Sequence, residues 1–533
     1  MTRHGFRKVS FARLSLGLVA AGALLVSSAA AGASAAVAGP SPAAGRLVVP
    51  TADGAVQGKA SGMMDEFLGI PYAAPPVGPL RWRAPQPPAR WHGIRQATKF
   101  GPHCPQPPSP FGVASTSQNC LYLNVFTPAN TPAGQRLPVM VWLPGGAFVF
   151  GESNDYHPTG LVRHGVVVVT LNYRIGALGF LADKALAGPD GSAGNYGLMD
   201  QQAALRWVQA NIARFGGDPG NVTLFGESAG GVSVLSQLAS PGARGLFAKA
   251  IVESGTYDLA QQPLAAAESA GRAFAAKVGC TTDVGACLRK LPVKTIIDDE
   301  DFSGYEPDLD GQVLTQPVYT ALASGEFNRV PVIIGTNRDE WRLFVGLDTV
   351  EGNPVTSSNY ESMIESTLGV PASVAAVIEA KYPLSHYSSP SVALGAVGTD
   401  AIFACPAVVA ERSLSTYVPT FAYEFNDRHA PQRYLPPVGF PYGAAHASEL
   451  QYLFTLHNTP NPGVLSPAQR QLAAAMKQDW TNFAKSGVPA RPAVWPQFTS
   501  TGHQVLSLLP PKPQVETNYS AEHHCPFWGV PGS

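Results

Sequence analysis

The sequence predicts an open, mainly parallel α/β sheet with helices on both faces. Continuous apolar runs rich in Val and Ile alternate with helix-compatible segments, which is typical of strands buried on both faces. Two of these runs flank an amphipathic helix, and such a strand–helix–strand unit requires a right-handed parallel crossover. The expected strands are 137–143, 166–173, 222–225, 248–253, 330–334 and 420–425.

The helix between the second and third of these strands is predicted from one apolar stripe. Its apolar residues recur every three or four positions, and Gly216-Gly217 end the pattern. Asp200 is expected to cap its N-terminus. The stripe consists of Leu205, Val208, Ile212 and Phe215.

The N-terminus has the three parts of a secretory signal peptide. A basic segment precedes an apolar run over 14–26, and A-x-A sequences follow at 33–35 and 36–38. This run is shorter than the roughly 20 residues that span a bilayer, so no stable membrane anchor is expected. We predict that residues 1–38 are removed on secretion and that residues 39–533 form a single domain.

The composition excludes some classes of partner. Charged residues make up 14% of the chain, and the formal net charge is −1. No strong positive field is therefore available to bind nucleic acid or an anionic membrane surface. A small neutral molecule is the more compatible partner, and the sequence carries no indication of an oligomeric state.

The six cysteines form an even set, as expected of disulfides in an exported protein. Six cysteines permit fifteen pairings, and sequence alone does not choose among them. The spacing favours one short bridge, one that closes a Pro-rich loop and one that ties the C-terminal segment to the body. These would be Cys280 with Cys287, Cys104 with Cys120, and Cys405 with Cys525.

A G-x-S-x-G motif lies between an expected strand and an expected helix. It runs from Gly226 through Glu227, Ser228 and Ala229 to Gly230. In this context the glycines allow a sharp turn that exposes the serine hydroxyl, and the N-terminus of the following helix favours negative charge. Ser228 is therefore the candidate nucleophile.

A serine hydroxyl needs a general base, which is itself oriented by a carboxylate. In folds with this motif the chain order is serine, acid, histidine, so both partners should follow Ser228. The expected strand at 330–334 runs on to Asp339 and Glu340, and a Gly-rich loop contains His446. Position alone leaves either carboxylate open as the acid and other histidines open as the base.

A small-residue loop after another expected strand could hold an oxyanion. The strand 139–143 leads into Pro144, Gly145, Gly146 and Ala147. The backbone N–H groups of Gly146, Ala147 and Ala229 are the candidate donors to a tetrahedral intermediate.

Taken together, these residues resemble the type-B carboxylesterases, a family that includes the cholinesterases and has the α/β-hydrolase fold. The resemblance covers nearly the whole mature chain. It rests on six segments that occur in order: 67–73, 120–125, 172–174, 195–201, 215–219 and 225–230.

The resemblance implies a serine carboxylesterase that acts on small ester substrates without a cofactor or metal. Ser228 would form an acyl-enzyme, His446 would act as general acid and base, and Glu340 would orient the histidine. The resemblance also supports the disulfide pairs above and implies an ion pair between Arg174 and Asp200. It implies further supporting roles around the histidine for Glu227, Ser254 and Glu449.

The sequence departs from the family pattern at several positions. Pro144 and Ala147 replace more usual residues of the glycine loop, and neither change removes the candidate N–H donors. Gln118 replaces a glutamate, so its expected contact with Arg81 becomes a neutral hydrogen bond. Segment 105–119 lacks the Trp that binds quaternary ammonium in cholinesterases, so choline esters are not the expected preferred substrate.

Two other functions remain open at this stage. One is a lipase for long-chain acylglycerols or sterol esters, which would need an extended apolar pocket. The other is an inactive binding or adhesion module, which typically lacks one of the three candidate residues.

If His446 acts as the base, kcat/KM should rise with pH through an apparent pKa near 7.

Overall fold

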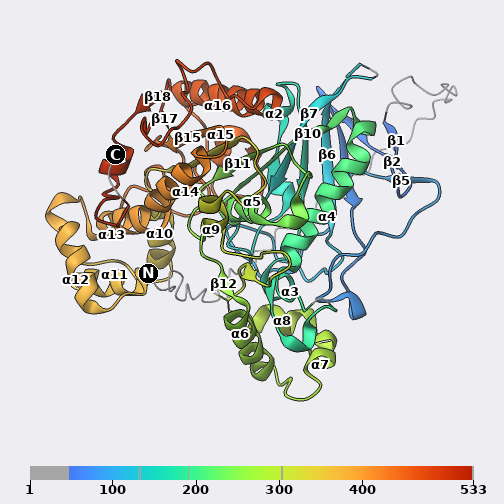
Figure 1. Cartoon of the computed structure of the whole chain (residues 1–533), viewed down its shortest axis with the longest axis horizontal. Coiled ribbons are helices and arrows are strands. Elements are labelled where there is room, and N and C mark those ends of the chain that lie inside the picture. The colour runs from blue at the N-terminus through green and yellow to red at the C-terminus, as the bar shows by residue number, and fades with distance from the viewer. Residues whose placement is uncertain (1–46, 130, 133, 190, 302–303, 531–533) are drawn as a thin grey trace, which may run out of the picture.

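A sheet of 11 strands forms the centre of the structure (Figure 1). The computed structural model describes residues 47–129, 131–132, 134–189, 191–301 and 304–530. The predicted signal peptide, residues 1–38, lies outside the described residues. The seven neighbouring strands in the middle of this sheet run parallel, and antiparallel strands flank this block on both sides.

Across the sheet the strands follow one another in an order that differs from the chain order. In spatial order they are β18 (Gln514–Glu516), β17 (Val505–Leu508), β15 (Thr420–Phe425), β14 (Val332–Asn337), β11 (Lys249–Glu253), β10 (Gly217–Glu227), β7 (Leu137–Leu143), β9 (Val167–Leu171), β6 (Tyr122–Pro128), β4 (Met64–Pro71) and β3 (Lys59–Ser61).

Smaller sheets lie outside this centre. They consist of β1 (Val48–Pro50) with β2 (Ala55–Gln57) and β5 (Ile94–Gln96), β12 (Gln262–Pro263) with β13 (Asp308–Leu309), and β8 (Tyr156–His157) with β16 (Thr455–Leu456).

Helices cover both faces of the central sheet. Alternate residues of β7 face opposite hydrophobic clusters: Val139, Val141 and Leu143 lie in one, Met140 and Trp142 in the other. Helices α4 (Tyr196–Asn211), α5 (Ala229–Ala239), α9 (Val318–Ser324) and α14 (Cys405–Ser415) contribute to the first cluster; α2 (Thr159–Val162), α10 (Arg342–Val350), α15 (Leu450–Leu453) and α16 (Pro467–Ser486) contribute to the second.

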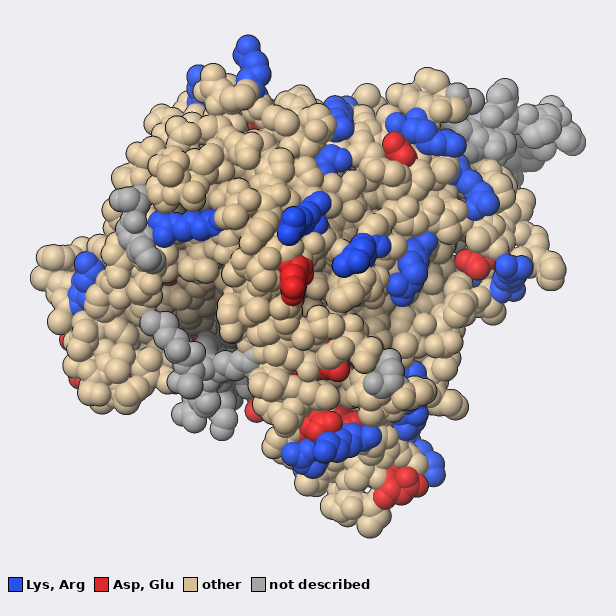
Figure 2. Space-filling view, viewed as in Figure 1, with Lys and Arg blue, Asp and Glu red and all other residues tan. Residues whose placement is uncertain are grey.

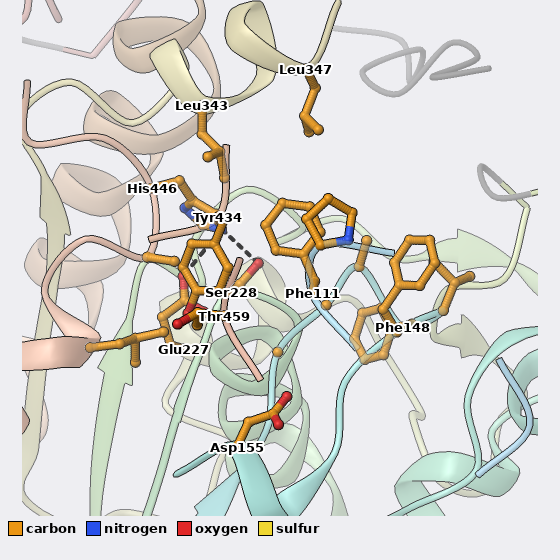
Figure 3. A pocket seen from close by; sticks show the side chains of 18 of the residues that line it. Phe111, Phe148, Asp155, Glu227, Ser228, Leu343, Leu347, Tyr434, His446 and Thr459 are labelled. Atoms are coloured by element: carbon orange, nitrogen blue, oxygen red, sulfur yellow. Dashed lines mark hydrogen bonds and ion pairs between the residues drawn. The ribbon is translucent and has the colours of Figure 1, made fainter. Parts of the chain in front are cut away.

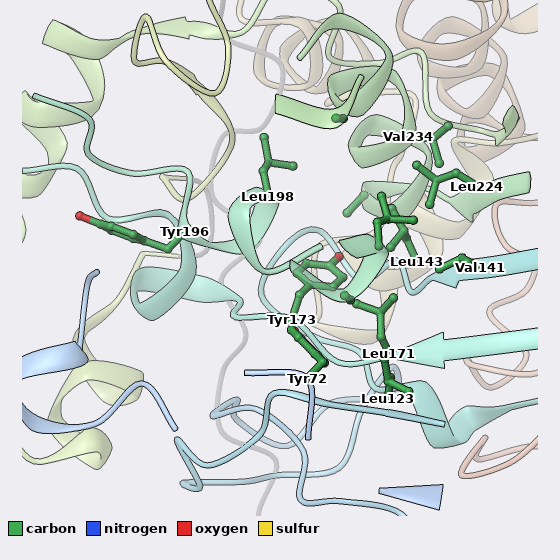
Figure 4. Packing of buried hydrophobic residues seen from close by; sticks show 14 of the residues in the cluster. Tyr72, Leu123, Val141, Leu143, Leu171, Tyr173, Tyr196, Leu198, Leu224 and Val234 are labelled. Atoms are coloured by element: carbon green, nitrogen blue, oxygen red, sulfur yellow. The ribbon is translucent and has the colours of Figure 1, made fainter. Parts of the chain in front are cut away.

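Figure 4 shows this packing in the first cluster. Leu143 and Leu224 of the sheet lie near Val234 of α5, and Leu198 of α4 belongs to the same cluster. Burial of both sheet faces provides the dominant favourable contribution to folding.

The remaining helices form peripheral lobes (Figure 1). One lobe contains α6 (Leu264–Lys277), α7 (Val284–Lys290) and α8 (Val293–Asp299), close to α3 (Gly176–Phe180). Another contains α11 (Tyr360–Leu368), α12 (Ala372–Lys381) and α13 (Pro390–Gly398), and α17 (Tyr519–Glu522) lies near the C-terminus. The continuous apolar helix Pro390–Ser415 is long enough to cross a membrane, but 72% of its most apolar window is buried within the protein.

All the predicted strands are present, and the predicted apolar helical stripe is buried. The prediction that Asp200 caps that helix is wrong, because α4 begins earlier, after Asn195. Asp200 lies inside the helix, and both of its carboxylate oxygens bind Arg174, at 2.7 Å from Nε and 2.7 Å from Nη2. A carboxylate with this cationic partner can be buried inside a helix, whereas a cap would lie at its end.

The covalent links and one predicted polar contact agree with expectation. The bridges are Cys104–Cys120, Cys280–Cys287 and Cys405–Cys525. Arg81 Nε donates a hydrogen bond to Gln118 Oε1 at 2.7 Å, the neutral contact expected at this position.

The three bridges should contribute unequally to stability. Cys405 and Cys525 are 120 residues apart, whereas Cys280 and Cys287 are 7 apart. In the chain-entropy description, the longer loop restricts the unfolded chain more, so replacing Cys405 and Cys525 by Ala should lower the free energy of unfolding by about 2–5 kcal/mol. Denaturant unfolding of this variant beside the Cys280→Ala/Cys287→Ala variant measures the difference, and equal losses would contradict it.

Candidate active site

Ser228 lies at a strained turn between β10 and α5. Its backbone has φ 56° and ψ −123°, in the positive-φ region that L-residues rarely adopt. The flanking glycines allow this turn: a Cβ on Gly226 would lie 2.6 Å from the Gly230 carbonyl, and one on Gly230 would lie 2.0 Å from the Leu143 carbonyl oxygen. The motif glycines are therefore required by close backbone packing.

The structure brings Ser228, His446 and Glu340 into one hydrogen-bonded chain, and Figure 3 shows its contact between Ser228 and His446. His446 Nε2 is 2.8 Å from Ser228 Oγ, and His446 Nδ1 is 2.7 Å from Glu340 Oε2. In the neutral ring, the hydroxyl can donate to Nε2 only when Nδ1 carries the proton and donates it to Glu340. This arrangement permits the serine proton to pass to Nε2.

Asp339, the alternative acid, faces elsewhere. Its carboxylate binds Arg342 at 2.8 Å and Arg428 at 3.1 Å, and accepts a hydrogen bond from the Ala444 N–H. Glu340 instead accepts a hydrogen bond from the Asn337 N–H through Oε1, at 2.7 Å, and uses Oε2 for the histidine. The tight turn after β14 thus directs successive carboxylates to different partners.

The glycine loop after β7 lies directly beside the serine. A Cβ on Gly145 would be 3.1 Å from Ser228 Cβ. Gly146, Ala147 and Phe148 all have positive φ values, so this segment is sharply turned. In the described part of the chain, the N–H groups of Gly146 and Ala147 donate to no protein acceptor, and Ala229 begins α5, where N–H groups lack intrahelical acceptors. All three N–H groups thus lack a protein acceptor among the described residues and stay candidates for binding an oxyanion.

Pro144 is also held in place in this loop. Its carbonyl oxygen accepts a hydrogen bond from the Tyr173 hydroxyl at 2.7 Å. The departures from the family pattern at Pro144 and Ala147 thus leave the loop anchored and its N–H groups available.

Buried carboxyl groups surround His446. Glu227 Oε1 is 3.2 Å from His446 Nε2, and Glu449 Oε2 accepts a hydrogen bond from Asn337 Nδ2. Burial, and then the charges of nearby acids, raises the pKa of Glu227 to about 8. Burial raises the pKa of Glu449 to about 7, and the charge of Glu340 adds to the effect. A neutral carboxyl is thus favoured where desolvation is complete.

The histidine titrates in the opposite direction. Burial by itself lowers the pKa of His446, but the charges of Glu227 and Glu340 outweigh it and raise the pKa above its usual range. The phenyl rings of Phe344 and Phe403 lie 5.3 and 5.2 Å from the imidazole, so they shield this cluster from water. Because His446, Glu227 and Glu449 influence one another's pKa, they take up and release protons as a coupled group.

Ser254 and Glu253 occupy the end of β11 nearby. Ser254 is buried with φ 50°, and among the described residues its hydroxyl has no hydrogen-bond partner. Its side chain therefore does not hydrogen-bond to His446. Glu253 is also buried, and Trp480 Nε1 donates to its Oε1 at 2.8 Å. Burial raises the pKa of Glu253 well above its usual range.

An apolar pocket opens onto Ser228 (Figure 3). Its volume is about 140 Å³. Aromatic and aliphatic side chains from distant segments form most of its wall, including Phe111, Phe148, Leu343, Leu347 and Tyr434. Asp155, Asn458 and Thr459 add polar groups, which sequence reasoning missed because no local motif marks them.

The described residues contain no group of three or more His, Cys, Asp or Glu arranged to hold a metal ion. His523, near the C-terminus, hydrogen-bonds to Asp400 and Glu424, at 2.6 Å each. This network ties the C-terminal segment to the body.

Comparison with known proteins gives the family. Residues 45–528 match the model of the carboxylesterase family. Para-nitrobenzyl esterase of Bacillus subtilis (strain 168) is 37% identical over 487 residues, covering 86% of this chain and 94% of the relative. Fumonisin B1 esterase of Sphingopyxis macrogoltabida is 35% identical, covering 86% and 85%. Acylcarnitine hydrolase of Mus musculus is 34% identical, covering 79% of each chain.

The sheet, the serine turn and these similarities agree with one another. The chain therefore belongs to the carboxylesterase family, has the α/β-hydrolase fold and is a carboxylic ester hydrolase.

Proposed function

We propose that this protein is a secreted serine carboxylesterase that acts on short esters through an acyl-enzyme on Ser228. The observation that carries the proposal is the hydrogen-bonded chain from Ser228 Oγ through His446 to Glu340, located at the base of an apolar pocket. A nucleophile, a base and an orienting acid in this geometry are the requirements for acyl transfer.

The first half of the reaction forms the acyl-enzyme. Ser228 Oγ attacks the ester carbonyl carbon while its proton passes to His446 Nε2. The negative charge that develops on the carbonyl oxygen is stabilised by the N–H groups of Gly146, Ala147 and Ala229. His446 then donates the proton to the leaving alkoxide, and the alcohol departs.

The second half releases the acid. Water attacks the acyl carbonyl and gives a proton to His446 Nε2, and the same N–H groups stabilise the second tetrahedral intermediate. Nε2 returns the proton to Ser228 Oγ as the carboxylic acid leaves. Throughout, Glu340 holds Nδ1–H and stabilises the positive charge on the ring.

The pocket supports short esters as substrates. Its volume of about 140 Å³ is below the roughly 300–1,000 Å³ of sites for drug-sized ligands. A long acyl chain would need more enclosed apolar space. One relative is named for nitrobenzyl esters, whose alcohol part is aromatic, and the aromatic wall around Phe111 and Tyr434 is compatible with such a group.

Two features support export of the protein. The N-terminal pattern of a basic segment, an apolar run and A-x-A sequences is typical of a signal peptide. All six cysteines are paired in disulfides, which persist in oxidising compartments.

In Figure 2 the Lys and Arg side chains lie singly among uncharged residues over the upper part of this face, and the Asp and Glu side chains lie mainly at its lower end. The formal net charge of the whole chain is −1.

A series of 4-nitrophenyl esters from acetate to palmitate tests the proposed activity. We expect kcat/KM to be greatest on the short esters and to fall towards palmitate, because the pocket encloses little space. The Ser228→Ala variant should lose activity by on the order of 10⁴-fold or more, since the nucleophile and base act as a unit. An optimum at palmitate would indicate a lipase, and an inactive but folded wild type would indicate a binding module.

The pH profile tests the electrostatic role of Glu227. Because His446 must be neutral to accept the serine proton, kcat/KM should rise with pH through the pKa of His446. The raised pKa of His446 moves this rise above the value near 7 expected from sequence. In Glu227→Gln a neighbouring negative charge is lost, so the rise should move to lower pH by about one unit.

The matched control is Glu361→Gln, an exposed residue of α11 outside the pocket. Its profile should coincide with that of the wild type. An unchanged profile in Glu227→Gln, or activity independent of pH between 5 and 9, would exclude this electrostatic role.

A further inference from the structure

The pocket has a polar end that the reaction described above does not use. The short strands β8 and β16 pair antiparallel, with Tyr156 opposite Leu456, and the His457 N–H donates to the Asp155 carbonyl oxygen at 2.9 Å. This pairing brings Asn458 beside Asp155, although 303 positions separate them, and Asn458 Nδ2 donates to Asp155 Oδ1 at 2.7 Å. Both residues line the same pocket as Ser228.

Glu152 lies next to Asp155 and shares Asn458 with it as a hydrogen-bond donor. Glu152 is fully buried, and its Oε2 accepts hydrogen bonds from the Val113 N–H at 3.0 Å and from Gln106 Nε2 at 3.2 Å. Its Oε1 lies 3.5 Å from Asn458 Nδ2. One amide thus bridges the two carboxyl groups, and only Asp155 is exposed to the pocket. Figure 3 shows the Asp155 carboxyl group directed into the cavity.

The geometry indicates which part of the ester faces Asp155. His446 Nε2 delivers the proton to the leaving alcohol, and Glu227 lies 3.2 Å from that nitrogen. Tyr156 and Tyr434 line the same pocket as Glu227 and Asp155. The leaving alcohol oxygen must lie near His446 Nε2 and hence near Glu227, so we assign the alcohol part of the ester to the part of the pocket that contains Asp155.

Acidic side chains line the pocket, and no Lys or Arg is present among the described lining residues. The acids are Asp155, Glu227, Asp301 and Glu306, and the histidines are His446, whose pKa is raised, and His457. Burial, and then the charge of Glu152, raises the pKa of Asp155 to about 8, so Asp155 is mainly ionised only above that pH. There it repels a carboxylate on the substrate, whereas a hydroxyl or an ammonium group finds a carboxyl oxygen as acceptor.

We propose that Asp155, held by Asn458 and Glu152, is a specificity-determining residue that accepts a hydrogen bond from a hydroxyl or ammonium group on the alcohol part of the ester. The inference rests on the proposed function. The substrate class is then the monoesters of diols, polyols or amino alcohols, and esters with an anionic alcohol part are disfavoured.

Matched acetates test this assignment. The alcohol part of each acetate is an alkyl chain of two to six carbons that ends in a hydroxyl, an ammonium or a carboxylate group. Each of these esters is compared with the n-alkyl acetate in which a methyl group replaces the polar end group. At the length that reaches Asp155, we expect the hydroxyl ester to exceed its alkyl counterpart in kcat/KM by about three- to tenfold. The carboxylate ester should be the poorest substrate.

Two substitutions separate the two donor groups. Asp155→Leu removes the acceptor, so both the hydroxyl and the ammonium preference should fall to about one. The ratios are measured at pH 9, above the pKa of about 8 to which burial raises Asp155, so that its carboxyl group is mainly ionised. Asp155→Asn keeps an acceptor oxygen but removes this charge, so the hydroxyl preference should persist while the ammonium preference is lost. Asp298→Asn, the same change at an exposed residue of α8 outside the pocket, should leave both ratios unaltered.

A binding measurement on the wild type needs no variant. Butane-1,4-diol should inhibit hydrolysis more strongly than 1-pentanol, which has a methyl group in place of the second hydroxyl. This experiment decides the question even if Asp155→Leu fails to fold.

The outcomes separate a failure of the proposed function from a failure of the role assigned to Asp155. If n-alkyl acetates are not hydrolysed in a Ser228-dependent manner, the proposed function fails. If they are hydrolysed but hydroxyl and alkyl esters are equivalent, or if the preference survives Asp155→Leu, only the role of Asp155 is overturned. A preference seen with methyl ω-hydroxyalkanoates instead would overturn the assignment to the alcohol side.

Discussion

The sharp turn at Ser228 is the constraint on which the rest of the site depends. A positive φ at a serine costs about 1–3 kcal/mol, so the surrounding structure must hold it. Gly226 and Gly230 allow the turn to pack directly against the Leu143 carbonyl. That close contact also fixes the glycine loop beside the serine. The nucleophile and the candidate oxyanion donors are thus positioned by one packing contact between β7, β10 and α5.

Electrostatics around His446 follow from burying several acids together. Glu227, Glu340 and Glu449 all lie in water-excluded positions, and only Glu340 hydrogen-bonds to the ring. Their charges raise the pKa of His446, while burial raises the pKa of Glu227 and Glu449 in turn. The proton balance therefore belongs to the group as a whole. In the proposed mechanism, the burial that excludes water from His446 therefore also influences the pH at which this histidine can act as a base.

The pocket combines an apolar wall with several acidic side chains. The wall supplies most of the contact area for an uncharged ester, and Asp155 and Glu227 line the same cavity. In the proposed scheme, acyl transfer depends on Glu340 through His446, whereas the choice of the alcohol depends on Asp155.

The sequence by itself determined the local features. Apolar runs predicted the buried strands, and the spacing around Gly226 and Gly230 predicted the serine turn, because these patterns depend on nearby residues. Position along the chain narrowed the acid to Asp339 or Glu340, and only the family resemblance favoured Glu340, since the choice depends on where adjacent side chains point after β14. The prediction that Asp200 is a cap was wrong because α4 begins earlier and the partner of Asp200, Arg174, lies outside the helix.

Only the tertiary structure decided the shape and charge of the pocket. Asp155 and Asn458 are brought together by the pairing of β8 with β16, and no periodicity links residues so far apart in the chain. The burial that raises the pKa of Glu227 likewise depends on segments from the whole molecule. Strands and turns are encoded locally, whereas a cavity is the product of long-range contacts.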